Sequence, residues 1–291
     1  MPLIHIEPFK VRSYECDAYG HVNNTTYLRY MQEAAFNASA AAGYDRARYD
    51  AIGHHWLVRE TDIEYLRPLF YGDTFEVKTW VEDFRRVRSR RSYEFRRTGS
   101  ADLIARAHTD WVYYNNKTQQ PATVPPEMIA AFFPEGMTKP PAKRDPFPSA
   151  PPPPPGVFRM NRRVLWRDID SAGHVNNSVY LSYIEDCGML LLAESGWSIE
   201  RMIAEGFVIL IRRHQIEYLQ PAAIHDNLEI AMWTFNLRGA TAMRYHTITR
   251  MSDRELLVRA YSYSVWVNPV TGRPVRVPER FLADTRSNIV A

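Results

Sequence analysis

Hydrophobic positions recur at helical spacing in two stretches of the chain. Each stretch follows a pair of asparagines, which can cap free amides, and ends at a glycine, Gly43 or Gly196, suited to a left-handed C-terminal cap. Mostly apolar residues recur every three or four positions, at Tyr27, Met31, Ala34, Ala35, Ala38 and Ala42 and again at Tyr180, Ile184, Cys187, Leu191 and Glu194. We therefore expect two helices of about 18 to 20 residues.

Other stretches have the composition of β-strands. Residues 56–66, 73–84, 90–98 and 102–114 are rich in β-branched and aromatic side chains. Glycine-containing turns at 72–73 and 99–100 lie between the first and second and between the third and fourth of these stretches. A single long helix beside an antiparallel sheet, without alternating strand and helix units, predicts the α+β class.

The chain repeats itself. Residues 17–27 (DAYGHVNNTTY) match residues 170–180 (DSAGHVNNSVY) at an offset of 153, and the same offset carries Trp80 to Trp233 without a gap. Between the copies lies a segment with five consecutive prolines, which lack amide donors and favour an extended chain. We predict a first domain at 1–136, a proline-rich linker at 137–156 and a second domain at 157–291. The alternative for the linker is a proline-rich ligand for another domain.

Composition excludes several classes of protein. The 291 residues are 45% hydrophobic and 24% charged, which is typical of a globular protein and not of a disordered one. The net charge of +3 is too small to predict nucleic-acid binding. No stretch approaches the roughly 20 apolar residues of a membrane helix, and the N-terminus lacks the pattern of a secretory signal, so we expect no membrane partner and a cytoplasmic location. The two cysteines, Cys16 and Cys187, predict neither a disulfide framework nor a zinc site.

The repeated motif Asp-x-x-Gly-His-Val-Asn-Asn has the parts needed for acyl transfer to water. Asp17 and Asp170, each expected at the end of a strand, precede a glycine turn and then the start of a long helix. Free amides and the positive end of the helix dipole can stabilise an oxyanion, and the carboxylate can act as general base or nucleophile. This chemistry requires no metal and no organic cofactor. The alternative is that the aspartate only caps the turn while the asparagines cap the helix.

At these residues the sequence resembles the 4-hydroxybenzoyl-CoA thioesterase family of hot-dog proteins, and among them the acyl-CoA thioesterases. The resemblance rests on residues 17–30 and 170–183, with support from 63–73 and 216–226. It implies a double hot-dog fold, in which each unit wraps an antiparallel sheet around one long helix.

The same resemblance implies that the chain hydrolyses acyl-CoA thioesters. Asp17 and Asp170 then supply the general base or nucleophile, and amides around Asn24 and Asn177 form the oxyanion hole. The family's active sites lie where two hot-dog units pair, and the resemblance also implies a homo-oligomer of such chains.

Two alternatives remain open for the function. Acyl-carrier-protein thioesterases also carry an Asp and a His-Val-Asn-Asn string, and His21 and His174 match their histidine as supporting residues. Those enzymes typically have an asparagine two residues before the histidine, where this chain has Tyr19 and Ala172, so the pattern favours CoA. The second alternative is a module that binds acyl thioesters without catalysis.

Two further features concern substrate binding. Residues 85–97 contain seven arginines, of which Arg88, Arg90 and Arg91 are candidates for binding the CoA phosphates, the alternative being a charged, solvated strand face. The alanines of the first helix, set against Leu190, Leu191 and Leu192 of the second, predict more room for an acyl tail in the first half.

Overall fold

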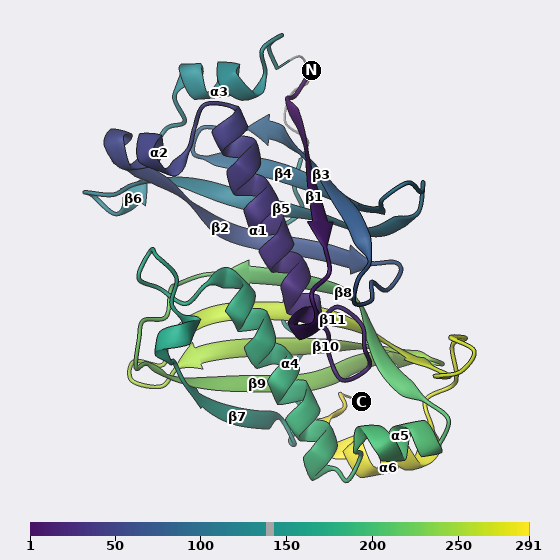
Figure 1. Cartoon of the computed structure of the whole chain (residues 1–291). Coiled ribbons are helices and arrows are strands. Elements are labelled where there is room, and N and C mark those ends of the chain that lie inside the picture. Colours follow the sequence, from purple (N-terminus) through teal and green to yellow (C-terminus); the bar gives the residue numbers. More distant parts are fainter. Residues whose placement is uncertain (138–142, 291) are drawn as a thin grey trace. The chain divides into compact units, whose positions relative to one another are not determined.

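The chain folds into two compact units. The computed structural model describes residues 1–137 and 143–290, and the chain divides into Met1–Pro146 and Phe147–Ala291 (Figure 1). The division falls inside the segment predicted as a linker, of which residues 138–142 lie outside the described part of the chain. No helix in the described residues is long and apolar enough to cross a membrane.

The first unit wraps one sheet around a long helix. Its strands pair antiparallel in the order β1-β3-β4-β5-β2, with β6 on β5, and α1 lies across one face of this sheet (Figure 1). The elements are β1 (Ile4–Lys10), α1 (Asn24–Ala41), α2 (Arg46–Ile52), β2 (His54–Tyr65), β3 (Thr74–Phe84), β4 (Arg88–Arg97), β5 (Leu103–Asn115), β6 (Gln120–Pro121) and α3 (Pro126–Phe132).

The second unit repeats this arrangement. Its strands pair antiparallel in the order β7-β9-β10-β11-β8, and α4 lies across the sheet as α1 does in the first unit. The elements are β7 (Phe158–Arg163), α4 (Asn177–Glu194), α5 (Ile199–Ala204), β8 (Val208–Tyr218), β9 (Asn227–Arg238), β10 (Thr241–Arg250), β11 (Leu256–Val267) and α6 (Glu279–Thr285). The predicted α+β double hot-dog fold is confirmed.

The long helices begin and end where the sequence predicts. Asn23 and Asn176 are the N-caps, and their side-chain oxygens accept hydrogen bonds from the amides of Thr25 and Ser178, both at 2.9 Å. Just past the two C-caps, Gly43 and Gly196 adopt φ values of 80° and 75°, a conformation that glycine tolerates best. Each helix has 18 residues.

The apolar stripe of each helix packs on its sheet. Met31, Ala34 and Ala38 are buried in the first unit, and Ile184 and Cys187 are buried in the second. The predicted stripe is wrong at its last position in the second unit, because Glu194 is the final residue of α4 and its charged side chain remains in solvent.

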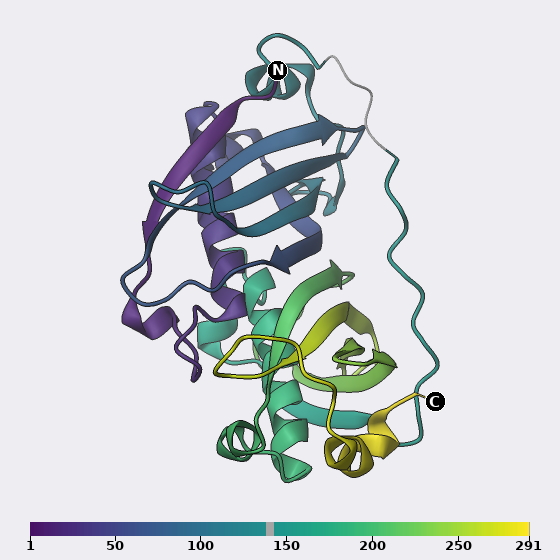
Figure 2. The same cartoon turned by 90° about the vertical axis from the view of Figure 1, so that its right-hand side faces the viewer.

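Residues 143–154 form no helix or strand (Figure 2), but two of their side chains contact the unit to which each belongs. Arg144 forms ion pairs with Asp83 and Asp110 of the first unit. Phe147 packs in an aromatic cluster of the second unit, with its ring centroid 5.6 Å from that of Tyr261. The side chains of Arg144 and Phe147 thus each pack on the unit to which the residue belongs.

Candidate active site

The two motif aspartates lie in turns and not at strand ends as expected from the sequence. After β1 the chain forms a 3₁₀ turn at Ser13–Glu15, and a bridge between Cys16 and Val22 then closes the loop that holds Asp17. The second unit repeats this path with a 3₁₀ turn at Trp166–Asp168 and a bridge between Ile169 and Val175. β1 ends at Lys10, before the motif aspartate. Two residues later the backbone amide of Arg12 donates to the carboxylate of Glu15 at 2.6 Å and no longer to a neighbouring strand.

Asp17 is held by the turn through one of its two oxygens. Its Oδ1 accepts hydrogen bonds from the amides of Tyr19 at 2.9 Å and His21 at 3.2 Å. Within the described residues, Oδ2 makes no hydrogen bond to the protein. Partial burial raises the pKa of the Asp17 carboxyl above its ordinary value, against the opposing effect of the turn amides. A carboxylate with one free oxygen and a raised pKa is suited to accept a proton.

Asp170 is held through both oxygens. Its Oδ1 accepts a hydrogen bond from the amide of Ala172 at 2.8 Å, and Oδ2 accepts one from Nδ2 of Asn176 at 3.2 Å. Because Asn176 is the N-cap of α4, this carboxylate is tied directly to the start of the long helix. The interpretation of the aspartate as a structural cap therefore describes Asp170 better than Asp17.

Asn24 and Asn177 are the first residues of the two long helices, where backbone amides have no partner within the helix. Tyrosines on neighbouring strands fix both positions. The Tyr65 hydroxyl donates to the carbonyl of Asn24 at 3.3 Å, and the Tyr218 hydroxyl donates to that of Asn177 at 3.1 Å. The positive end of each helix thus adjoins a loop with a motif aspartate.

The two histidines shape the loops through their backbones. The carbonyl oxygens of His21 and His174 accept hydrogen bonds from the amides of Asp17 and Asp170, at 2.7 and 3.0 Å. The ring of His21 packs edge-on against Phe70, with centroids 5.2 Å apart, whereas His174 is exposed. In the described part of the chain neither imidazole forms a hydrogen bond.

Two buried carboxylates support these loops, and the sequence reasoning missed them. Glu15 and Asp168 are 8% and 5% exposed, and they accept hydrogen bonds at 2.7 Å from the hydroxyls of Tyr30 and Tyr183 on the long helices. Burial and the adjacent carboxylates raise the pKa of both tyrosines. The sequence does contain a sign of this pair: an acidic residue stands two positions before each motif aspartate, and both the acidic residues and the tyrosines are repeated at the offset of 153.

The three arginine candidates for phosphate binding do not share one surface. Arg90 forms a bidentate pair with Asp110 at 2.7 and 2.9 Å, and only Arg88 is exposed. Arg91 is buried on the opposite face of β4, where it donates to Oγ1 of Thr79 at 3.3 Å and its guanidinium lies 5.7 Å from the ring centroid of Phe132 in α3. The pairing of β4 with β5 thus gives each arginine a different environment.

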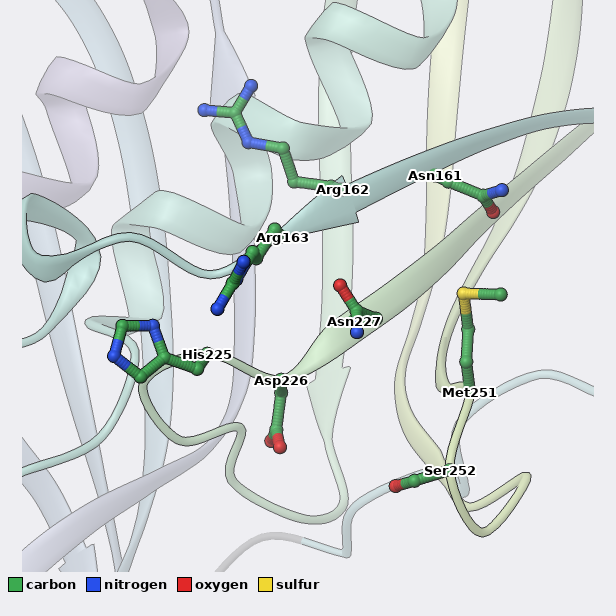
Figure 3. Close-up of a pocket in the computed structure, with 8 residues that line it drawn as sticks. All are labelled: Asn161, Arg162, Arg163, His225, Asp226, Asn227, Met251 and Ser252. Carbon is green, nitrogen blue, oxygen red and sulfur yellow. The ribbon is translucent and has the colours of Figure 1, made fainter.

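An open hollow of about 530 Å³ lies in the second unit beside the loop that precedes Asp170 (Figure 3). Its lining is polar and includes none of the motif residues: Asn161, Arg162, Arg163, His225, Asp226, Asn227, Met251 and Ser252. Arg162 also pairs with Asp186 of α4 at 3.8 Å. Across residues 1–137 and 143–290, no three His, Cys, Asp or Glu side chains gather as metal ligands would.

Comparison with known proteins identifies the family. The sequence model of the thioesterase-like superfamily matches residues 11–132 in the first unit and 164–284 in the second. The chain therefore belongs to this superfamily, and each unit is one copy of its domain. A palmitoyl-acyl carrier protein thioesterase of Cuphea hookeriana is 27% identical over 194 residues, covering 62% of this chain and 46% of that protein. The match thus spans about half of that relative. The acyl-CoA thioester hydrolase YbgC of Escherichia coli is 27% identical over 128 residues, covering 44% of this chain and 95% of that protein.

Solved structures share the architecture of both units. A Lactobacillus plantarum protein described as an oleoyl thioesterase superposes with a TM-score of 0.78 at 17% identity, covering 96% of this chain and 98% of that one. The 12:0-ACP thioesterase of Umbellularia californica superposes with a TM-score of 0.69 at 20% identity, covering 93% and 97%. Because both sequence identities are 20% or lower, the similarity to these two structures shows a shared fold only.

Proposed function

We propose that the chain hydrolyses acyl thioesters to a free acid and a thiol. The observation that carries the proposal is the superfamily match in both units, with an aspartate loop adjoining the start of the long helix in each. Asp17 accepts a proton from water, and the resulting hydroxyl oxygen bonds to the thioester carbonyl carbon. The carbonyl oxygen becomes an oxyanion beside the first-turn amides, the carbon–sulfur bond then breaks, and the thiolate leaves to be protonated.

We propose acyl carrier protein as the first candidate for the thiol carrier. The Cuphea relative acts on a carrier-protein thioester, and its match extends over 62% of this chain, which is more than one unit. The double hot-dog of the 12:0-ACP thioesterase adds support at the level of the fold. The CoA thioester remains the second candidate, because YbgC matches one unit over nearly its whole length and because Tyr19 and Ala172 stand where carrier-protein enzymes have asparagine.

The test compares one acyl group on two carriers. Release of free thiol is measured for the purified full chain with an acyl-carrier-protein thioester and with the matching CoA thioester. A higher kcat/KM for the carrier-protein substrate supports the first candidate, and a higher value for CoA supports the second. Tight binding of either substrate without thiol release contradicts hydrolysis and supports the non-catalytic binding module.

A further inference from the structure

Three aromatic side chains of the first unit lie in solvent on the turns around Asp17, and the proposed chemistry does not use them. Tyr14, Phe70 and Tyr71 are 77%, 46% and 70% exposed. Single exposed apolar side chains are normal on a protein surface, whereas a group of large ones is typical of an interaction site. We call these three residues the aromatic rim.

The loop between β2 and β3 holds two members of the aromatic rim beside the Asp17 loop. His21 and Phe70 form an isolated β-bridge, so the two loops run next to each other at that point. Two residues further on, the amide of Gly72 donates to the carbonyl of Val11 at 3.1 Å, on the other side of the Asp17 loop. Both aromatic residues of this loop therefore lie next to the segments that hold Asp17 in place.

The backbone that carries Phe70 and Tyr71 is fixed by a tight turn. The amide of Phe70 donates to Oδ2 of Asp73 at 2.9 Å, and the amide of Asp73 donates to the carbonyl of Phe70 at 3.1 Å. Asp73 also forms an ion pair with Arg97 at 2.6 Å, and Gly72 has the left-handed φ of 86° that glycine adopts most easily. Because the turn is already ordered, a partner that binds there does not have to order it.

Tyr14 lies on the 3₁₀ turn that leads into the Asp17 loop. This turn is anchored by the Glu15 carboxylate, which accepts hydrogen bonds from the amide of Arg12 at 2.6 Å and from the Tyr30 hydroxyl at 2.7 Å. The Arg12 guanidinium lies beside the Tyr14 hydroxyl. Tyrosine and arginine are enriched among the residues that contribute most of the affinity at protein interfaces.

The second unit builds the same turn without these aromatic side chains. At the offset of 153, the aromatic rim is matched by Arg167, Ala223 and Ile224. The amide of Ala223 donates to Oδ2 of Asp226 at 2.8 Å, as the amide of Phe70 does to Asp73. Trp166 of the second unit is exposed, but it corresponds to Ser13 and not to a member of the aromatic rim. The aromatic rim is therefore not needed to build the turn.

We propose that the aromatic rim docks the acyl carrier protein that brings the thioester to Asp17. The inference rests on the proposed function, because it assigns the surface that meets the thiol carrier of that reaction. Any carrier has to approach Asp17, and the aromatic rim lies on the turns around that aspartate. The rim also occurs in the unit whose aspartate keeps one oxygen without a hydrogen bond among the described residues.

The exposed area of the aromatic rim suits a protein better than a thin pantetheine arm. An aromatic side chain buries about 150–250 Å², so the three exposed fractions add up to roughly 300–400 Å². Weak, transient interfaces bury less than about 600 Å² on each partner. The aromatic rim alone can therefore supply about half of such an interface.

The experiment compares one acyl group on three carriers: acyl carrier protein, CoA, and N-acetylcysteamine, a small thiol with neither protein nor nucleotide. kcat and KM are measured for the unmodified chain, Tyr14→Ser and Tyr71→Ser. We expect each substitution to raise KM for the carrier-protein substrate about tenfold or more. The KM for the N-acetylcysteamine thioester should change far less. An equal loss on all three carriers, or a loss with CoA alone, overturns the inference and leaves the hydrolase intact.

Phe36→Ser is the matched control for removing an exposed aromatic side chain. Phe36 is exposed on α1 and lies twelve positions after Asn24, which is about 18 Å along the helix axis. This substitution should leave KM for all three carriers unchanged. Trp166→Ser tests the other aspartate loop, and a larger rise in KM there than in Tyr14→Ser and Tyr71→Ser overturns the inference.

Binding without turnover separates docking from hydrolysis. The holo carrier protein, which has the pantetheine arm but no acyl group, is titrated into the full chain by calorimetry. We expect Tyr71→Ser to weaken this binding about tenfold or more, and Phe36→Ser to leave it unchanged. Binding that depends on Tyr71 while no thioester is hydrolysed supports docking and contradicts the hydrolase. Equal affinity of Tyr71→Ser and the unmodified chain, or no measurable binding to either, overturns the inference even if thioesters are hydrolysed.

Discussion

Asp17 and Asp170 occupy matching positions, but their carboxylates have different surroundings. Asp17 uses one oxygen for the turn amides, while Asp170 uses one for an amide and the other for the helix N-cap. A general base needs a lone pair directed at water. Each carboxylate accepts two hydrogen bonds, but in Asp17 both go to Oδ1, whereas in Asp170 each oxygen accepts one. The two halves of the molecule are therefore unequal at the residue that the proposed chemistry needs most.

We predict that Asp17→Asn reduces thioester hydrolysis more than Asp170→Asn does. Loss of a general base costs about 100- to 10,000-fold in rate, whereas Asp170→Asn should act mainly by loosening the start of α4. The assay is thiol release under saturating substrate. Asp45→Asn is the matched control, because Asp45 caps α2 through Arg48 and asparagine caps equally well. A larger loss in Asp170→Asn would assign the base to the second unit.

The raised pKa of Asp17 predicts two opposite pH effects. Hydrolysis needs the ionised carboxylate, so kcat/KM should rise with pH through a midpoint above the ordinary aspartate value of about 3.9. The effect of pH on stability has the opposite sign. Because the pKa of Asp17 is higher in the folded chain than in the unfolded chain, this group stabilises the fold fully at pH values below its unfolded-state pKa. That contribution is lost as the pH rises through its folded-state pKa.

Asp17→Asn should therefore be more stable than the unmodified chain at neutral pH, with this advantage vanishing under acid, as measured by urea unfolding at about pH 7 and about pH 4. An advantage that is the same at both pH values would mean that Asp17 is not desolvated.

At the scale of elements, buried tyrosines connect each loop to its long helix. The hydroxyls of Tyr30 and Tyr183 reach the buried carboxylates of Glu15 and Asp168, two residues before the motif aspartates. Removal of either hydroxyl leaves a buried carboxylate without one of its donors. We expect Tyr30→Phe and Tyr183→Phe each to lower the free energy of unfolding by about 1.5–3 kcal/mol. Tyr114→Phe, a substitution on the half-buried end of β5, should cost little, and an equal cost there would contradict this account.

The N-caps allow a comparison between the two helices. Asn23→Ala should cost about 1 kcal/mol, the usual value for a lost N-cap. Asn176→Ala should cost more, because Asn176 also donates to Asp170. Urea unfolding measures the stability, and thiol release measures whether the freed Asp170 becomes a better base. Equal destabilisation by the two substitutions would show that the Asn176–Asp170 hydrogen bond contributes nothing.

What the sequence could predict follows from how local each interaction is. Helix limits depend on neighbours, such as Asn23 with Thr25 and the glycine past each helix, and these were predictable. The partner of Arg90 depends on the pairing of β4 with β5, and no spacing along the chain identifies Asp110. The support of Glu15 by Tyr30 joins a turn to a helix, so only the folded unit reveals it.

At the scale of the whole molecule, the duplicated units have diverged on the sheet face that points away from the helix. In the second unit this face carries Trp233, Tyr245 and Tyr261, which form one aromatic cluster with Phe147. In the first unit the corresponding positions are Trp80, Ser92 and His108. In the connecting segment, Arg144 belongs to the first unit and forms ion pairs with Asp83 and Asp110 of its sheet. The charged side chain of Arg144 thus contacts acidic residues on the first sheet, and the aromatic side chain of Phe147 contacts aromatic residues on the second.

Phe147 should stabilise the second unit even though it lies in the predicted linker. Its ring is 9% exposed, packs on Tyr261, and has the Arg259 guanidinium 4.8 Å from its centroid. Phe147→Ala should lower the free energy of unfolding of this unit by about 2–4 kcal/mol, near the lower end for buried phenylalanines because the site can partly refill with water. Phe147→Leu keeps most of the apolar contact and should cost less than about 1.5 kcal/mol. Amide hydrogen exchange of β9 and β11 reports the stability of this unit. Unchanged exchange in Phe147→Ala would mean that the segment only lies on the sheet without stabilising it.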